Sequence, residues 1–464
     1  MVHSNLKMKA AVLMEPNEPL QIIELPVPPP KRGQVLVKMM ATGICHTQLL
    51  EISGQNTNRP MNPNLLGHEG SGIVEEVGEG ILKVKKGDHV ILSWIKGNGA
   101  NVLPDKYNLN GQEINAGFVT TFNEYCLASE NRVTKISKEM PFPEASLIGC
   151  AVATGGGAVL NNANVKKDHS VLVVGVGGIG INMAHVSSYV GANPIIAVDI
   201  NDEKLEFSKK FGATYTINSK NKNLSEVDAE IREVVGEGGL DYAFETTGRK
   251  EIMEFIYNSV KKSTGIALFC GVPKPLNLKI EIDPFPLYFG RRIVGTGGGE
   301  SNPDIDFPKY CQMFLDGKLK LSEMITHTFS LDKINEGIEL MKKGECCRVV
   351  IDFTKEKEVL PELINTGPIS DLPHSENKKK YKVIYKRKDC IGVLTCTAFY
   401  PKRWVINKDD ALADLVGGTQ DPDNPGTWTL FFTEDELDQF KSSAEVCPVN
   451  VIEIYDIESG NKLS

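Results

Sequence analysis

Residues 170–199 read SVLVVGVGGIGINMAHVSSYVGANPIIAVD, and this stretch decides the fold. The unbroken apolar run at 171–174 is typical of a strand that is buried on both faces. A glycine-rich turn follows directly, then a segment with helical spacing at 181–189 and a second apolar strand at 195–198. This order of strand, turn, helix and strand predicts a βαβ unit of a parallel, doubly wound sheet.

The turn has the spacing Gly-x-Gly-x-x-Gly at Gly175, Gly177 and Gly180, with Gly178 inside it, and Asp199 ends the second strand. The first glycine permits a tight turn, the second lets a pyrophosphate approach the backbone, and the third lets helix and strand pack closely. The acid can then hold the ribose hydroxyls. The same spacing also occurs in ordinary glycine turns. Because both strands, the helix and the acid are in register, we predict a dinucleotide-binding Rossmann domain.

The composition is that of a globular protein, because 41% of the 464 residues are hydrophobic and 24% are charged. A net charge of -9 argues against nucleic acid or an anionic membrane as a partner. We identify no apolar run as long as a membrane span and no apolar signal-peptide core at the N-terminus, so we expect a cytoplasmic protein. In a reducing compartment, its ten cysteines are expected to be buried thiols or metal ligands.

Residues 8–155 contain short apolar segments punctuated by glycines, which predicts a β-rich domain. Within it, Cys45, His68 and Cys150 are candidate metal ligands. Two thiolates and one imidazole suit zinc, and three protein ligands leave open the fourth position that a catalytic zinc needs. Taken singly, each residue is equally compatible with a buried thiol or a surface histidine, because the spacing is wide.

The surrounding segments favour the zinc interpretation. Residues 43–47 (GICHT), 67–72 (GHEGSG) and 147–150 (LIGC) resemble the zinc-dependent medium-chain alcohol dehydrogenases. The glycine turn, 199–204 (DINDEK), 325–327 (ITH), 334–337 (INEG) and 344–348 (GECCR) follow in the order of that family. The resemblance covers about residues 8–353, and the Cys-His-Thr triplet is similar to that of the glutathione-dependent formaldehyde dehydrogenase branch.

The resemblance implies a GroES-like catalytic domain at residues 1–153 and 296–354, and a Rossmann NAD-binding domain at residues 154–295. It also implies a role for each matching residue. These are Cys45, His68 and Cys150 as zinc ligands, Glu69 as a carboxylate behind the zinc, Thr47 as the group that takes the proton of the alcohol, His46 and Arg348 near the cofactor pyrophosphate, Gly175, Gly177, Gly178 and Gly180 at the phosphates, and Asp199 and Lys204 at the adenosine ribose.

The sequence departs from the family pattern in two places. The family often carries four closely spaced cysteines around a second, structural zinc, but residues 95–117 contain no cysteine, so we expect one zinc per chain. Where the family often has Asp and His for proton transfer, this chain has Gln48 and Leu50. We therefore expect the proton to leave by another route, such as the ribose hydroxyls and solvent. Gln48 can donate a hydrogen bond but brings no charge.

Residues 355–379 combine charges with three prolines and a glycine, and we interpret them as a flexible linker. Residues 380–464 form a different module, in which Cys390 and Cys396 are followed by a remote Cys447-Pro448. This pattern resembles the single-cluster bacterial-type ferredoxins and implies an α+β ferredoxin domain.

A four-iron ferredoxin of this type would have a thiolate at position 393, but Val393 cannot bind iron. The three thiolates of Cys390, Cys396 and Cys447 suit a 3Fe-4S cluster. A 4Fe-4S cluster with a non-protein fourth ligand and a ferredoxin fold without a cluster are the alternatives. The module has 10 Lys and Arg against 14 Asp and Glu, which suits docking on a basic redox partner.

Together these features predict an NAD-dependent zinc alcohol dehydrogenase that converts an alcohol reversibly to an aldehyde or ketone, fused to an electron-transfer ferredoxin. Hydride transfer moves two electrons together, whereas an iron–sulfur cluster takes one, and the sequence shows one dinucleotide motif and no second cofactor motif. We therefore expect the ferredoxin to serve a separate step, carrying electrons from a ferredoxin reductase to a P450-type oxygenase that makes the alcohol. We also expect a homo-oligomer, either a dimer or a tetramer.

Two other functions are compatible with parts of the sequence. In one, the protein is mainly an electron-transfer ferredoxin whose dehydrogenase half is a docking scaffold. In the other, it is a zinc-free quinone or enoyl reductase of the same superfamily. Retention of Cys45, His68 and Cys150 together argues against both functions.

Overall fold

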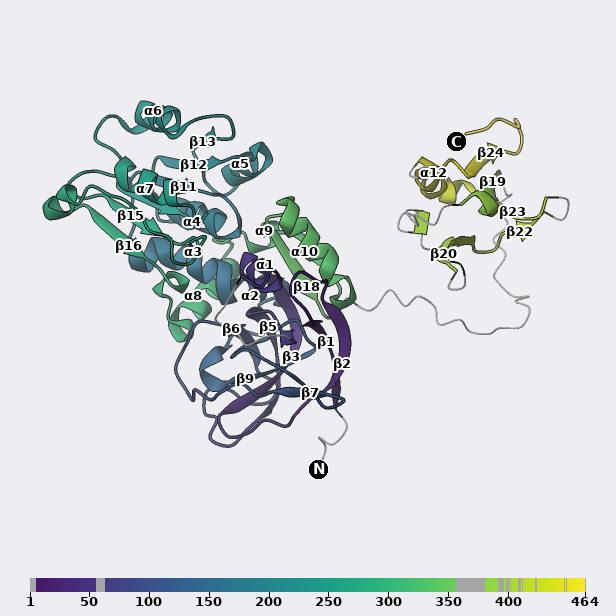
Figure 1. Ribbon diagram of the computed structural model, residues 1–464, viewed down its shortest axis with the longest axis horizontal. Helices are drawn as coiled ribbons and strands as arrows, with labels where there is room; N and C mark the ends of the chain where they lie inside the picture. The colour runs from purple at the N-terminus through teal and green to yellow at the C-terminus, as the bar shows by residue number, and fades with distance from the viewer. Residues whose placement is uncertain are drawn as a thin grey trace. The chain divides into compact units, whose positions relative to one another are not determined.

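The computed structural model describes residues 6–55, 63–355, 380–390, 396–397, 400, 402–407, 410, 412–421, 424–445, 447 and 449–463 (Figure 1). The chain forms two compact units, Met1–Leu360 and Pro361–Ser464. Residues 356–379 of the predicted linker lie outside the described residues, and so does Val393.

A seven-stranded, mainly antiparallel sheet forms the β-rich part of the first unit, in the order β10-β6-β5-β3-β18-β17, with β9 paired to β3. Alternate residues of β3 enter different cores: Val35, Val37 and Met39 pack in one and Leu36 in another. This explains why the strand is buried on both faces. The strands of this part are β1 (Lys7–Leu13), β2 (Gln21–Pro26), β3 (Gln34–Ile44), β4 (Asn64–Leu65), β5 (Glu69–Val77), β6 (His89–Ser93), β7 (Tyr107–Leu109), β8 (Gln112–Ile114), β9 (Tyr125–Ser129), β10 (Val133–Lys135), β17 (Ile325–Phe329) and β18 (Arg348–Asp352).

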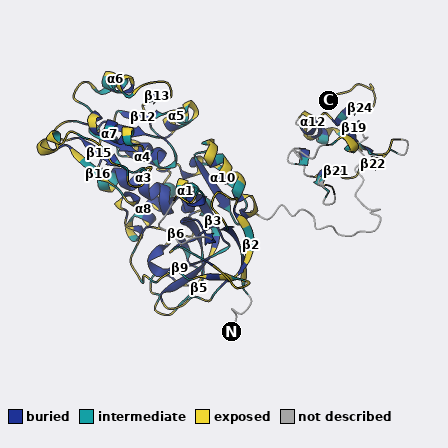
Figure 2. Cartoon of the chain, in the orientation of Figure 1, coloured by how far each residue is buried: buried dark blue, intermediate teal, exposed yellow. Residues whose placement is uncertain are grey.

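The predicted βαβ unit lies at the centre of a six-stranded parallel sheet, in the order β13-β12-β11-β14-β15-β16. Alternate residues of β11 pack on opposite faces, with Val171 and Val173 in one core and Leu172 and Val174 in the other. Helices cover both faces, so these strands are buried (Figure 2). The strands are β11 (Val171–Val174), β12 (Ile195–Asp199), β13 (Tyr215–Asn218), β14 (Tyr242–Glu245), β15 (Ile266–Phe269) and β16 (Arg292–Gly295).

The helices of the first unit connect these strands and cover the sheets. They are α1 (His46–Ile52), η1 (Glu130–Arg132), α4 (Gly178–Tyr189), α5 (Asp202–Lys209), α6 (Leu224–Val235), α7 (Lys250–Ser259), η4 (Phe285–Phe289), η5 (Gly298–Glu300), α8 (Pro303–Leu315), α9 (Leu321–Met324), η6 (Leu331–Lys333) and α10 (Ile334–Lys343).

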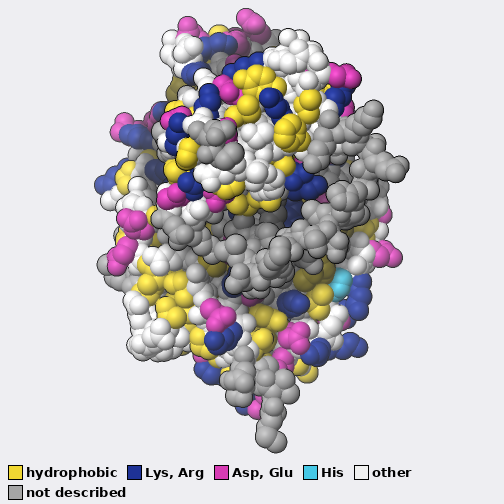
Figure 3. Space-filling view, turned by 90° about the vertical axis from the view of Figure 1, so that its right-hand side faces the viewer, with side chains coloured by type: hydrophobic (Ala, Val, Ile, Leu, Met, Phe, Trp, Pro, Cys, Tyr) yellow, Lys and Arg dark blue, Asp and Glu magenta, His cyan; other side chains and the backbone are white. Residues whose placement is uncertain are grey.

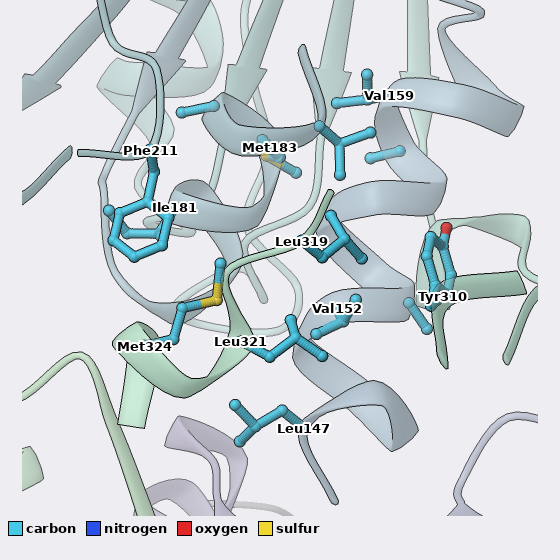
Figure 4. Close-up of a cluster of buried hydrophobic side chains, with 14 of the residues drawn as sticks. Leu147, Val152, Val159, Ile181, Met183, Phe211, Tyr310, Leu319, Leu321 and Met324 are labelled. Carbon is cyan, nitrogen blue, oxygen red and sulfur yellow. The ribbon is translucent and has the colours of Figure 1, made fainter. Parts of the chain in front are cut away.

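One long apolar helix corrects the sequence interpretation. The segments α2 (Phe142–Leu147), η2 (Ile148–Val152), α3 (Ala153–Gly157) and η3 (Ala158–Asn162) follow one another without a break. By length and composition alone, Phe142–Asn162 could cross a membrane, contrary to the expectation that no apolar run is long enough. However, 83% of its most apolar window is buried within the fold, in a cluster that includes Val152, Leu321 and Met324 (Figure 4). It is therefore the core helix of a folded unit.

The second unit contains a four-stranded sheet in the order β22-β23-β19-β24 and a two-stranded sheet, β20-β21. Its core is aromatic: the ring centroids of Tyr385 and Trp404 lie 4.9 Å apart, and those of Phe432 and Phe440 lie 4.4 Å apart. The elements are β19 (Tyr381–Lys386), η7 (Arg387–Asp389), β20 (Trp404–Ile406), β21 (Ala413–Leu415), β22 (Thr419–Gln420), β23 (Thr427–Phe432), η8 (Glu434–Glu436), α12 (Leu437–Glu445) and β24 (Ile452–Asp456).

Candidate active site

The structure brings the three predicted zinc ligands together from three separate elements. Cys45 follows β3, His68 precedes β5, and Cys150 lies in the π-helical segment η2, a type of distortion that is frequent at functional sites. All three residues are buried, and their ligand atoms lie within 4.8 Å of one another. Gly149 makes this possible, because a Cβ there would lie 2.5 Å from the carbonyl oxygen of Leu92. Two thiols and an imidazole shielded from solvent form a donor set that suits zinc.

The three side chains are electrostatically linked. The Nε2 atom of His68 lies 3.3 Å from the Sγ atom of Cys150. A hydrogen bond from Cys150, aided by His68 and the charge of Arg348, holds the pKa of Cys45 well below its ordinary value against the effect of burial. The bond with Cys45 and burial raise the pKa of Cys150. The lowered pKa of Cys45 favours its thiolate, which is the form of cysteine that binds a metal.

Gln48 holds two of the three candidate ligands. Its Nε2 atom lies 2.8 Å from Nδ1 of His68, and its Oε1 atom accepts a hydrogen bond of 3.1 Å from the backbone N–H of Cys45. The same amide donates to Oε2 of Glu51 at 3.2 Å, and Glu51 is itself buried. Sequence reasoning identified Gln48 but missed Glu51. The signal was available, because residues three apart on a helix lie on one face.

An ion pair connects the metal group to the glycine turn. Arg348 pairs with Glu69, and both side chains are buried, with exposed fractions of 4% and 0%. Glu69 also accepts a hydrogen bond of 3.4 Å from the N–H of Ala151, next to Cys150. On its other side, Arg348 lies against Gly178, where a Cβ would come within 2.8 Å of the arginine Cδ. The predicted pyrophosphate residue therefore also contacts the carboxylate behind the metal group.

The glycine turn has the geometry that its spacing requires. Gly175 has a φ of +89°, which favours glycine, and a Cβ on Gly180 would lie 2.0 Å from the carbonyl oxygen of Gly175. By contrast, a Cβ on Gly177 would meet nothing within 4 Å, so the backbone there is open to a ligand. Asp199 closes the turn by accepting hydrogen bonds from the N–H groups of Val176, at 2.9 Å, and Ile200, at 2.8 Å.

The remaining predicted residues lie around these two centres. The hydroxyl oxygen of Thr47 is 3.8 Å from Sγ of Cys45. His46 lies on the first turn of α1, where desolvation and the charges of Lys204 and Arg348 lower its pKa against the opposite effect of Cys45. Lys204 lies on α5, and its Nζ atom approaches Gly344. Positive groups thus gather near the open backbone of the turn.

In the second unit, the three predicted cluster ligands face one core. Cys396 is buried there, and Cys390 and Cys447 pack partly buried against the same residues. Burial and the neighbouring Cys390 and Cys447 raise the pKa of Cys396 to about 11. Among the described residues, Cys45, His68 and Cys150 are the one group of three compact enough for a single metal ion.

Three segments of the chain match known protein families, and the chain is similar to dehydrogenases over three quarters of its length. Residues 31–138 match the alcohol dehydrogenase GroES-like domain, residues 175–316 the zinc-binding dehydrogenase family, and residues 383–454 the 4Fe-4S single cluster domain. The chain is 36% identical over 375 residues to S-(hydroxymethyl)glutathione dehydrogenase of Paracoccus denitrificans and 35% identical over 383 residues to alcohol dehydrogenase class-3 of Cereibacter sphaeroides. Each match covers 75% of this chain and 100% of the relative.

Solved structures agree with these matches. An alcohol dehydrogenase zinc-binding domain protein from Burkholderia ambifaria has a TM-score of 0.69 at 29% identity, and benzyl alcohol dehydrogenase from Acinetobacter calcoaceticus has a TM-score of 0.68 at 29% identity. Both matches cover 75% of this chain and 99% of the other. The comparisons confirm the predicted fold class, a GroES-like and a Rossmann domain followed by a ferredoxin-like domain.

Proposed function

The chain belongs to the zinc-dependent alcohol dehydrogenases, and from this premise we propose that it oxidises an alcohol reversibly to an aldehyde or ketone at Cys45, His68 and Cys150, with NAD as acceptor. The observation that carries the proposal is the compact, buried donor set, joined through Glu69 and Arg348 to the open glycine turn. Neither alternative function explains this connection. A docking scaffold needs no metal site, and a zinc-free reductase needs no link between a metal site and the glycine turn.

Each side chain then has a task in the reaction. When bound, zinc supplies a Lewis acid that polarises the alcohol, and NAD supplies the hydride acceptor. Thr47 accepts the proton of the alcohol beside Cys45. The buried Glu69–Arg348 ion pair lies behind the three candidate ligands and places charged, hydrogen-bonded groups next to them. Since Leu50 cannot carry a proton, the proton taken up at Thr47 would leave by another route towards solvent.

The nucleotide is held by charge and by open backbone. The positive groups of Arg348 and Lys204 attract the pyrophosphate and the ribose region, and His46 lies near them as a hydrogen-bonding group. Asp199 accepts three hydrogen bonds from backbone N–H groups, those of Val176, Ile200 and Asn201, and its carboxylate has lone-pair capacity left for the ribose hydroxyls.

Metal analysis combined with a turnover assay tests this function. We expect one zinc per chain and zinc-dependent formation of NADH from an alcohol. Cys45→Ser should abolish turnover and leave NAD binding intact. Cys126→Ser is the matched control, because Cys126 is buried but lies outside the metal group. Turnover in zinc-free protein, or full activity of Cys45→Ser, would show that the reaction does not use this site.

For the second unit, we propose that Cys390, Cys396 and Cys447 hold a 3Fe-4S cluster that carries electrons from a ferredoxin reductase to a P450-type oxygenase of the same pathway, in the cytoplasm. Their shared position against one core and the valine at position 393 support three ligands rather than four. On the face in Figure 3, acidic and basic side chains of the described residues are interspersed. Cluster reduction by alcohol and NAD alone would contradict the separate electron path.

We also propose that two copies of the chain associate through the edge of the six-stranded sheet. β16 is the outermost strand of that sheet, and an exposed edge strand is a template for pairing with another chain. Beside it, Phe285, Tyr288 and Phe289 are 65%, 85% and 60% exposed. Light scattering should show a dimer or a tetramer, and Tyr288→Asp should shift it towards the monomer. A monomer in the wild type would refute the association.

A further inference from the structure

Arg132 carries a buried charge that no described residue neutralises. Its side chain lies at the end of η1 and is 6% exposed. One amino group, Nη1, donates to the carbonyl oxygen of Trp94, and the guanidinium carbon lies 5.0 Å from the ring centroid of Phe118. Nε is buried and has no hydrogen-bond partner. Burial alone lowers the pKa of Arg132, with no carboxylate acting against it.

A second buried arginine, Arg291, shows that a buried guanidinium in this fold can have its Nε atom hydrogen-bonded. Arg291 is 5% exposed and lies 4.8 Å from the ring centroid of Tyr257, so its burial and stacking match those of Arg132. Its Nη2 donates to the carbonyl oxygen of Val260 at 2.9 Å, and its Nε donates to that of Lys261 at 3.5 Å. The Nε–Nη2 edge is thus used in Arg291. In Arg132 the same edge, which binds carboxylates side-on, makes no hydrogen bond to the described residues.

Arg132 is connected to the metal group through a single residue. Trp94 directly follows β6, and its backbone N–H donates to the carbonyl oxygen of His68 at 3.1 Å. Its carbonyl oxygen accepts the bond from Arg132. Trp94 therefore joins a candidate zinc ligand to the guanidinium of Arg132.

The same residues present apolar surface to solvent. Trp94 is 40% exposed and Phe118 is 39% exposed, which is high for aromatic rings beside a buried metal group. Trp94 also faces Gly298, where a Cβ would lie 3.3 Å from its ring. Ligand sites combine apolar walls of this kind with a few polar groups that fix orientation.

We propose that Arg132 binds the carboxylate of the substrate, and that Trp94 and Phe118 flank the body of the same molecule. The substrate class is then an alcohol with a flat apolar body and a carboxylate at the end remote from the hydroxyl. The inference rests on the proposed function, since the hydroxyl must react at Cys45, His68 and Cys150. A carboxylate would neutralise the charge of the guanidinium and accept two hydrogen bonds from its Nε–Nη2 edge.

A matched pair of substrates tests the proposal on the full-length, zinc-loaded protein with NAD. Benzyl alcohol and 4-(hydroxymethyl)benzoate differ only in the carboxylate. In Arg132→Met, kcat/KM for 4-(hydroxymethyl)benzoate should fall roughly tenfold to a hundredfold, mainly through KM, as expected for loss of a hydrogen bond to a charged group. For benzyl alcohol the change should stay within about threefold. Arg132→Lys should be intermediate, since lysine keeps the charge without the planar fork.

Arg291→Met is the control, because it removes an arginine of equal burial and stacking without touching the metal group. It should leave the ratio of the two kcat/KM values unchanged. If Arg132→Met lowers kcat/KM equally for both alcohols, or if Arg291→Met changes the ratio in the same way, Arg132 is structural and the proposal is overturned.

Calorimetry with benzoate separates this proposal from the proposed function, because binding needs no turnover. Benzoate should bind the wild type and Arg291→Met but bind Arg132→Met at least about tenfold more weakly. If neither alcohol is oxidised but this binding difference is present, the dehydrogenase function fails and the carboxylate site stands. If benzyl alcohol is oxidised and benzoate binds all three proteins equally, the site fails and the dehydrogenase function stands.

Discussion

Replacing Gln48 by leucine should weaken zinc binding without unfolding the site. Gln48 contributes one hydrogen bond to the ring of His68 and one to the backbone of Cys45, so it positions two of the three ligands. Leucine fills similar space but makes neither bond. At about 1 kcal/mol for each hydrogen bond, the loss is about 2 kcal/mol. Since 1.4 kcal/mol corresponds to a factor of ten, we expect zinc affinity to fall roughly 30-fold, within the range known for residues that orient metal ligands.

The geometry around His68 explains why losing the hydrogen bonds of Gln48 should weaken zinc binding. The amide nitrogen of Gln48 faces Nδ1 of His68, and Nε2 of His68 faces the Sγ atom of Cys150. If Nε2 holds zinc, the ring proton lies on Nδ1, which then needs a hydrogen-bond acceptor. Gln48 has both a donor and an acceptor to offer Nδ1, whereas leucine has neither.

The assay is competition between zinc-free, full-length protein and a chromophoric zinc chelator. Gln34→Leu is the matched control, because Gln34 is 4% exposed and bonds to Asp105 and to the N–H of Lys31, away from the metal group. It should leave zinc affinity unchanged. If Gln48→Leu also stays within about threefold of the wild type, the two bonds do not position the ligands and the reasoning is refuted.

Three further predictions follow from other parts of the chain. Burial and the nearby charge of Lys320 lower the pKa of His185 to about 4. Because the folded pKa lies below the unfolded value of about 6.5, stability should fall as pH drops from about 6.5 towards 4, by at most about 3 kcal/mol, and urea unfolding of His185→Gln should show a smaller pH effect. Asp199 should make the enzyme prefer NAD over NADP, because its carboxylate repels a 2′-phosphate. Asp199→Ala should reduce the ratio of kcat/KM for NAD to that for NADP, chiefly by weakening NAD binding. Equal kcat/KM values for the two cofactors in the wild type would contradict this. The oxidised protein should show a spin-half resonance near g of about 2 from a three-iron cluster, and Val393→Cys should allow conversion to four irons, whereas no cluster after anaerobic reconstitution would favour a degenerate ferredoxin fold.

The nucleotide domain was predictable because its signals are local. The apolar run of β11, the glycine turn and Asp199 lie within 30 residues, and each acts on its neighbours in the chain. The spacing alone requires a positive φ at Gly175 and a close approach at Gly180, and the structure shows both. In contrast, the pairing of β18 with the end of β3 joins distant segments, and the family resemblance indicated only that residues 296–354 return to the β-rich domain.

The metal group was predictable as a set of residue types but not as a network. Glu69 and Arg348 were assigned to the zinc and the pyrophosphate separately, yet they form one buried ion pair across 279 positions of sequence. That contact depends on β18 returning beside Cys45, which no periodicity encodes. Likewise, the apolar helix Phe142–Asn162 was overlooked because Glu144 and several glycines interrupt its hydrophobic run.

Arg132 shows most clearly what sequence reasoning cannot reach. An arginine at the edge of a strand ordinarily extends its head into water, and nothing in its flanking residues argues otherwise. Its burial arises from Trp94 and Phe118, which come from other segments. Yet burial alone does not mark it as functional, because Arg291 is equally buried and equally stacked. The two differ in whether the Nε–Nη2 edge has an acceptor, and a guanidinium that folding has desolvated without satisfying that edge is stabilised further when an anion binds there.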